Sequence, residues 1–223
     1  MNREMNRDMN GDINGDRAEE ARANGAEPGR APAAEALAQA ARAAGAKGPP
    51  PVHLWNPPYC GRLDIRIARD GLWHYLGTPI GREPLVRLFA SILRREGDEY
   101  FLVTPVEKVG IAVDDAPFVA VDFRVARDGE GAPALEFETN VGDRATLGPD
   151  HPLRLERDPG TGEPTPYIMV RAGLEARIDR KTFYRMVEIG EMAARPEGRM
   201  FGVWSSGAFF ALATAEELED EGG

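Results

Sequence analysis

The chain has 223 residues, of which 42% are hydrophobic and 29% are charged, and its formal net charge at pH 7 is −10. This composition is typical of a globular protein with one or two domains, and no apolar run approaches the roughly 18 residues of a membrane span. The negative charge argues against nucleic-acid binding, which needs a basic face. We therefore expect neither a membrane nor a nucleic acid as a partner.

Residues 1–51 are predicted to form a disordered tail that ends in a stiff, proline-rich linker. The opening MNREMNRDMNGDINGD is a four-residue repeat with few large apolar groups, so it cannot offset the entropy of ordering. The alanine-rich run 33–46 has high helix propensity and predicts a frayed helix. Residues 214–223 predict a second, acidic tail.

The folded part divides into an N-terminal α+β unit, 52–109, and a C-terminal β-rich α+β unit, 110–213. In the first unit the predicted elements are strands at 63–68 and 72–76, a helix over 82–96 and a strand at 100–105. Asp70 and Gly71 form a tight hairpin turn between the first two strands. Apolar residues spaced i, i+3, i+4 and i+7 from Leu85 predict the helix, and Gly97 supplies its C-terminal stop.

The C-terminal unit begins with a β-rich insertion and ends with a second helix. The predicted strands are 117–126, 133–139, 153–156, 166–170, 174–178, 199–204 and 207–212, with a helix over 180–193. Asp179 is the expected N-cap of that helix, because its carboxylate can accept hydrogen bonds from free backbone N–H groups. We expect a mixed α+β fold.

A faint internal duplication links the two units. The segment 67–89 (IARDGLWHYLGTPIGREPLVRLF) is echoed by 170–187 (VRAGLEARIDRKTFYRMV), and each copy runs through Glu-Gly into an apolar strand. The repeat predicts two strand–strand–helix–strand units, with a cleft between them as the place for a ligand.

Several familiar catalytic and metal-binding motifs are matched only in part, and the residues or spacings that their chemistry requires are missing. The three histidines are scattered, without metal-ligand spacing. Gly202 and Gly207 have P-loop spacing, but the lysine and hydroxyl residue that would hold phosphate and magnesium are missing. Ser205 and Ser206 lack the spacing of a nucleophile elbow. The single cysteine, Cys60, fits a buried or half-buried thiol and a reducing cytoplasm. No catalytic residue, metal site or cofactor is predicted.

A set of polar and aromatic residues at strand ends and turns forms the candidate ligand site. Its members are Arg66, Tyr75, Thr104, Glu107, Lys108, Thr139, Asn140, Asp143, Glu175, Arg177 and Trp204. Each also has a structural interpretation. Asn140 and Asp143 suit a turn, Glu175 and Arg177 share one strand face as an ion pair would, and the tryptophan suits a core.

The blocks 64–108, 137–154, 174–188 and 201–212 resemble the bacterial domain-of-unknown-function family 1285. The resemblance includes DIRIARDGLWHYLGTPIGREPLVRLF in the first block and FGVWSSGAFFAL in the last. It implies a duplicated core and a C-terminal domain loosely like pleckstrin-homology barrels. It also implies a ligand site between the halves for a nucleotide-like small molecule, and a role in signalling. It carries over no catalytic residues.

Three functions remain open. The favoured one is a cytoplasmic, non-catalytic sensor of an anionic, planar small ligand. Arg66, Lys108 or Arg177 would bind its charge, and Tyr75 or Trp204 would stack on it. The second is an enzyme with Glu107, Asp143 or Glu175 as general acid or base. The third is a protein-interaction module that uses a barrel edge or an exposed apolar surface.

Overall fold

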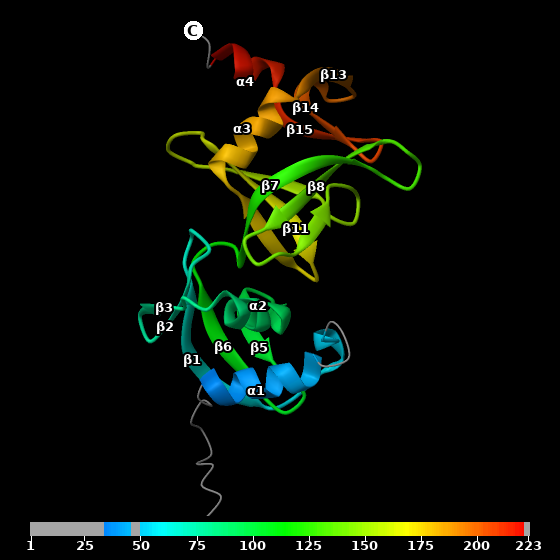
Figure 1. The fold of residues 1–223 in the computed structure, drawn as a ribbon. Coiled ribbons are helices and arrows are strands. Elements are labelled where there is room, and N and C mark those ends of the chain that lie inside the picture. The colour runs from blue at the N-terminus through cyan, green and yellow to red at the C-terminus, as the bar shows by residue number, and fades with distance from the viewer. Residues whose placement is uncertain (1–33, 46–49, 221–223) are drawn as a thin grey trace, which may run out of the picture. The chain divides into compact units, whose positions relative to one another are not determined.

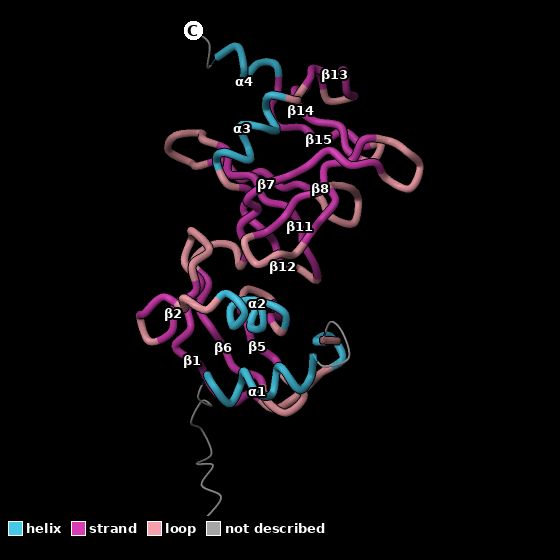
Figure 2. The backbone as a smooth tube through the Cα atoms, viewed as in Figure 1, coloured by secondary structure: helices cyan, strands magenta, loops and turns pink. Residues whose placement is uncertain are grey.

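The fold is mixed α and β and rich in strands, as the sequence predicts. The computed structural model describes residues 34–45 and 50–220, shown as a coloured ribbon in Figure 1. Strands predominate along the backbone trace of these residues (Figure 2). None of the helices within the described ranges is long and apolar enough to cross a membrane.

The helices are short and the strands fall into three sheets. The helices are α1 (Ala34–Gly45), the 3-10 turn η2 (Val52–Leu54), α2 (Glu83–Ser91), α3 (Arg180–Glu188) and α4 (Ala215–Asp220). The first sheet contains β1 (Tyr59–Ile67), β2 (Trp73–Tyr75), β3 (Thr78–Pro79), β4 (Leu93–Glu96), β5 (Glu99–Val103) and β6 (Lys108–Val113). The second contains β7 (Phe118–Arg127), β8 (Pro133–Thr139), β9 (Arg144–Thr146), β10 (Leu153–Arg157), β11 (Pro164–Arg171) and β12 (Leu174–Ile178). The third contains β13 (Glu191–Arg195), β14 (Gly198–Ser205) and β15 (Ala208–Thr214).

Each of the two larger sheets joins antiparallel strands through one parallel pair. The first sheet has the order β3-β2-β1-β6-β5-β4, and its parallel pair is β1 with β6. The second has the order β10-β11-β12-β7-β8-β9, and its parallel pair is β12 with β7. The chain passes from one sheet to the next between β6 and β7, so residues 114–117 connect them.

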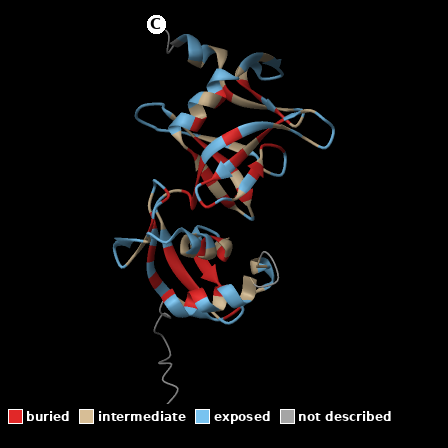
Figure 3. Cartoon of the chain, viewed as in Figure 1, coloured by how far each residue is buried: buried red, intermediate tan, exposed pale blue. Residues whose placement is uncertain are grey.

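The core of the first sheet follows from alternation along β1. Leu63, Ile65 and Ile67 are buried, whereas the residues between them are exposed, as expected for a strand with one covered face. On the covered face, Trp73 stacks on Phe89 of α2 with 6.4 Å between ring centroids. Figure 3 shows buried residues along the central strands.

Helix α1 lies within the segment that the sequence assigns to a tail. The predicted helix over the alanine-rich run is present, but its apolar stripe is packed into the core instead of fraying. Ala34, Leu37, Ala38 and Ala41 are buried, and the Leu37 side chain has no exposed surface. The spacing i, i+3, i+4 and i+7 explains this, because it places all four on one helix face. The rest of the predicted tail, 1–33 and 46–49, lies outside the described residues.

Both predicted helices end earlier than the sequence pattern indicates. The helix predicted over 82–96 ends at Ser91, and the one predicted over 180–193 ends at Glu188; in each case a strand follows. After α2, Leu93 of β4 pairs with Leu102 of β5. Gly97, predicted as a helix stop, has φ +60° in the turn between these strands. Over so few residues, the apolar spacing after each helix fits either a helix or a strand. Pairing with a neighbouring strand decides in favour of the strand.

The two segments of the predicted repeat have a similar order of elements, but their strands pair differently. In both, a hairpin leads into a helix, a second hairpin and a final strand. The final strand of the first copy, β6, pairs with β1, whereas that of the second, β15, pairs with β14. The duplication and the barrel-like likeness stay predictions. The expected boundary between 109 and 110 falls inside β6, which pairs with β1 and β5.

Gly71, in the turn between β1 and β2, is held by the side chain of Asn140. The Asn140 amide donates to the Gly71 carbonyl at 3.1 Å, and its Oδ1 accepts from the Val119 N–H at 3.0 Å. Gly71 has φ +84°, and a Cβ there would lie 2.6 Å from the Asn140 nitrogen and 2.8 Å from a Val119 methyl. Any side chain at position 71 must therefore displace Asn140.

We expect Gly71→Ala to destabilise the protein more than Gly77→Ala. Gly77 also has positive φ (+74°), but a Cβ there meets nothing within 4 Å. The control variant therefore carries only the backbone strain, roughly 1–2 kcal/mol. Gly71→Ala adds the loss of the Asn140 hydrogen bonds, at about 1 kcal/mol each. Denaturant unfolding should show about 2 kcal/mol between the variants, and equal stabilities would contradict this role of Asn140.

Candidate ligand site

An acidic pair, Asp114 and Asp115, follows β6 and anchors the polar network of the site. The Arg66 guanidinium donates to both carboxylate oxygens of Asp114, with Nε at 2.8 Å from Oδ1. This hydrogen bond lowers the pKa of Asp114 below its ordinary value. Arg66, predicted as a ligand contact, thus has a carboxylate partner within the chain.

The Asp115 carboxylate, 17% exposed, is surrounded by donors. The Tyr167 hydroxyl donates to Oδ1 at 2.8 Å, while Arg69 and Arg177 lie 3.4 and 3.5 Å from Oδ2. Arg177 also donates to the Arg69 carbonyl at 2.9 Å. Burial, followed by the hydrogen bond to Asp115, raises the pKa of Tyr167. Asp115 therefore fixes two arginines from distant parts of the chain beside one another.

A further arginine, Arg154, lies over the ring of Tyr167. The Arg154 guanidinium lies 4.1 Å from the centroid of the Tyr167 ring and makes a bidentate ion pair with Glu175, at 3.0 and 2.9 Å. The hydrogen bond with Glu175 raises the pKa of Arg154. Glu175, a candidate general acid or base from the sequence, is thus neutralised by a partner on the neighbouring hairpin.

Beside this network lies a pocket of about 680 Å³, which we call the arginine pocket. It is bordered by the 157–166 loop region, α3, β15 and α4. Its charged and larger apolar lining residues are Arg69, Arg157, Arg177, Arg180, Glu163, Glu217, Phe183, Tyr184, Val187, Phe201, Leu212 and Leu218. Four arginines against two glutamates give this lining a formal charge of +2, in a chain whose net charge is −10.

The arginines at the mouth of the pocket are held in exposed ion pairs. Arg180 lies 3.0 Å from Glu163 and donates from Nε to the Tyr184 hydroxyl at 3.0 Å. Arg157 lies 2.8 Å from Glu217 of α4. Because exposed pairs contribute only about 0–1 kcal/mol, an incoming anion can replace Glu163 at little cost.

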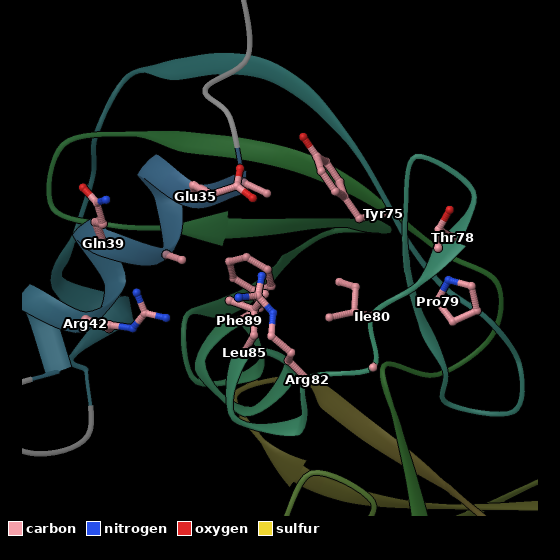
Figure 4. A pocket seen from close by; sticks show the side chains of 13 residues that line it. Glu35, Gln39, Arg42, Tyr75, Thr78, Pro79, Ile80, Arg82, Leu85 and Phe89 are labelled. Carbon is pink, nitrogen blue, oxygen red and sulfur yellow. The ribbon is translucent and has the colours of Figure 1, made fainter.

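A second pocket, of about 320 Å³, lies between α1 and the β2–α2 region, and we call it the α1 pocket (Figure 4). Tyr75, predicted to stack on a ligand, lines this pocket, whereas Arg177 lines the arginine pocket. The structure therefore separates two residues that the sequence hypothesis places at one ligand.

Thr104, Glu107 and Lys108 lie at the turn between β5 and β6, away from both pockets. The Thr104 hydroxyl accepts from the Glu107 N–H at 3.2 Å, as a turn-forming threonine does. Burial raises the pKa of Glu107. Lys108 pairs with Glu96 at 2.8 Å. Lys108 begins β6, whereas Arg66 faces Ala112 near its end, so these two cations do not share a site.

Thr139, Asn140 and Asp143 form the turn after β8. The Thr139 hydroxyl accepts from the Asp143 N–H at 3.0 Å, and the Asp143 carboxylate pairs with Arg171. Arg171 also donates to the Ala90 carbonyl at 2.7 Å. These contacts, together with the hydrogen bonds of Asn140 to Gly71 and Val119, match the turn interpretation of Asn140 and Asp143.

Trp204 packs at the surface of the third sheet. Its ring lies 5.2 Å from that of Phe209, centroid to centroid, and its side chain is 42% exposed. It lines neither pocket. Among residues 34–45 and 50–220 there is no group of three or more histidine, cysteine, aspartate or glutamate side chains that could hold a metal ion.

Of the four arginines that make the arginine pocket basic, sequence reasoning named only Arg177 as a ligand contact. Arginine is abundant in this sequence, so nothing distinguished Arg157 and Arg180 from the other arginines. Asp115 was also missed. The available indication was its position, because an Asp-Asp pair directly before the buried strand that starts at Phe118 needs cationic partners.

The fold and this site define a strand-rich α+β protein with a basic pocket in an acidic chain, and comparisons give its family. The N-terminal model of the family, a domain of unknown function (DUF1285), matches residues 50–116. The C-terminal model, a protein of unknown function (DUF1285), matches residues 117–212. The chain belongs to the DUF1285 family, which confirms the resemblance seen in its sequence.

Two solved structures are similar to this chain. A DUF1285 family protein from Silicibacter pomeroyi DSS-3 is 61% identical, with a TM-score of 0.72, and the match covers 82% of this chain and 97% of that one. A DUF1285 family protein from Shewanella baltica OS155 is 32% identical, with a TM-score of 0.45 and coverage of 56% and 91%. No curated protein matches the chain.

The ion pair of Arg66 with Asp114 predicts a pH-dependent contribution to stability. The folded-state pKa of Asp114 is lowered, so the stabilisation is present above the unfolded pKa and is lost as pH falls through the folded pKa. In Arg66→Gln the pKa of Asp114 should rise toward its ordinary value, as measured by carboxyl NMR titration. Arg62→Gln, which removes an exposed pair with Glu99, serves as the control. An unchanged pKa of Asp114 in Arg66→Gln would refute this assignment.

Proposed function

We propose that this protein is a non-catalytic, sensor-type binding protein for an anionic, nucleotide-like small molecule, and that the arginine pocket is its site. The observation that carries the proposal is the basic lining of this pocket, with Arg69 from the turn after β1 and the other arginines from the C-terminal half. The volume of about 680 Å³ lies within the range of small-molecule sites. The family resemblance supports the same ligand class and a role in signalling. The single cysteine supports a cytoplasmic location.

The arginines suit a phosphate better than a neutral ligand. Arg157 and Arg180 project charge into the pocket from separate elements, so a phosphate between them would accept charge-assisted hydrogen bonds from both. Of their present partners, Glu163 is exposed and easily replaced, whereas Glu217 is half-buried and also accepts from the Thr214 N–H at 2.7 Å. Arginine is also the side chain whose planar fork matches phosphate geometry.

The apolar part of the lining suits a planar ring. Tyr184 is 53% exposed and lines the pocket together with Phe183 and Phe201. An aromatic contact of this kind contributes about 0.5–1.5 kcal/mol beyond the area that it buries. A base or similar ring could therefore lie against α3 while its phosphate meets the arginines.

The two alternative functions have less support. Asp143 and Glu175 are each paired with an arginine, and neither they nor Glu107 line the arginine pocket or the α1 pocket. An interaction module would be favoured by an apolar patch away from the pocket. Three exposed apolar residues, Tyr184, Val187 and Leu218, line the pocket, whereas others, such as Met192 and Trp204 of the third sheet, do not.

Nucleotide binding can be measured as a thermal shift of the full chain. Adenosine and guanosine monophosphates are the probes, with adenosine and inorganic phosphate as partial ligands. At about 100 times Kd a nucleotide adds about 2.7 kcal/mol of stability, which raises the Tm by about 5–10 °C for a chain of this size. Adenosine and phosphate alone should each give a much smaller rise, because each lacks half of the contacts.

Variants of the pocket locate the effect. Arg157→Gln and Arg180→Gln should each weaken nucleotide binding about tenfold or more, since each removes a charge-assisted hydrogen bond. Arg127→Gln is the matched control, because Arg127 is exposed on β7 and contacts only the Gly131 carbonyl. If no nucleotide shifts the Tm, or if the shift is the same in all three variants, the proposal is wrong.

A further inference from the structure

The α1 pocket has one wall that belongs to α1 and one that belongs to the first sheet and α2. Glu35, Gln39 and Arg42 line it from α1, while Tyr75 and Arg82 line it from the other side. Ile80 and Leu85, both half-buried, supply apolar surface, as Figure 4 shows. Because α1 lies before residue 50, it falls outside both segments that the family models match.

Two arginines from these opposite walls face the same space. Arg42 lies in the last turn of α1 and Arg82 is the N-cap residue of α2. In Figure 4 the two guanidinium groups extend toward each other near Leu85. Among the described residues neither side chain makes an ion pair or a hydrogen bond. Two like charges placed in this way repel each other, and an anion between them would remove the repulsion.

The lining indicates the size and charge of that anion. With Glu35 counted against the two arginines, the charged lining has a formal charge of +1, which matches a monoanion. A cavity of about 320 Å³ lies at the lower end of small-molecule sites, so the ligand must be compact. Ile80 and Leu85 favour an apolar body.

We propose that the α1 pocket is a second ligand site, separate from the arginine pocket, for a small carboxylate with an apolar body. The carboxylate lies between Arg42 and Arg82, and the apolar body packs on Ile80 and Leu85. Because α1 contributes Arg42, the ligand binds the docked state of α1 and stabilises it. The concentration of the carboxylate then sets how firmly α1 is held on the first sheet.

The coupling has a measurable size. A ligand that binds only the docked state shifts the docking equilibrium by a factor of 1 + [L]/Kd. At about 100 times Kd, amide hydrogens of α1 that exchange through undocking should exchange about 100-fold more slowly. Amides of β14 and β15, which belong to another sheet, should be unaffected.

The test uses octanoate as the probe, added to the full chain, with calorimetry for affinity and hydrogen exchange for α1. Acetate carries the charge without the apolar body, and 1-octanol carries the apolar body without the charge, so both should bind at least about tenfold more weakly. Arg42→Gln and Arg82→Gln should each weaken octanoate binding by a similar factor. Both residues are exposed, so neither unliganded variant should have a lower Tm than the parent protein.

Two control variants distinguish binding in the α1 pocket from binding elsewhere on the protein. Arg87→Gln changes an arginine of α2 that pairs with Glu83 and does not line the pocket, so it should leave octanoate binding unchanged. Arg180→Gln, which weakens nucleotide binding in the arginine pocket, should also leave it unchanged. The proposal is overturned if octanol binds as tightly as octanoate, if Arg42→Gln has no effect, or if bound octanoate does not slow exchange in α1.

Discussion

The mostly buried carboxylate of Asp115 is the constraint on which the candidate site depends. A carboxylate removed from water needs compensating charges and donors, and here they are Arg69, Arg177 and Tyr167. Asp115 lies in the connection between the two large sheets, while Arg69 and Arg177 are 108 residues apart. The two arginines that compensate the charge of Asp115 therefore lie on the wall of the arginine pocket.

The charge of the protein is distributed unevenly, and for ligand binding the local charge of a pocket matters more than the net charge of the chain. A net charge of −10 describes the whole chain, yet the charged lining of the arginine pocket has a formal charge of +2. The four arginines of this pocket share three carboxylate partners, Asp115, Glu163 and Glu217. Elsewhere Arg66 and Arg154 have partners of their own, Asp114 and Glu175. A negative protein can therefore hold an anionic ligand where the arginines outnumber the acids, because nearby charges act more strongly than distant, screened ones.

Helix α1 shows how an added segment can create a site that the domain core lacks. Its apolar stripe is buried with the core of the first sheet. Its polar face supplies Arg42 to a pocket whose other arginine belongs to α2. The same docking event therefore both covers apolar surface and completes a binding site, so occupancy of the site and position of the helix are coupled.

The sequence determined the elements whose signals are local. Alternation along β1, the turn at Gly71 and the cap at Asp179, whose carboxylate accepts from the Thr182 N–H at 2.7 Å, are all encoded within a few residues. It also identified the family, and it placed Asn140 and Asp143 in a turn. Only the tertiary structure decided where both helices end, because β4 and β13 depend on pairing with strands later in the chain. Likewise, the separation of Lys108 from Arg66 and the meeting of Arg69 with Arg177 depend on contacts between distant segments, which no local pattern records.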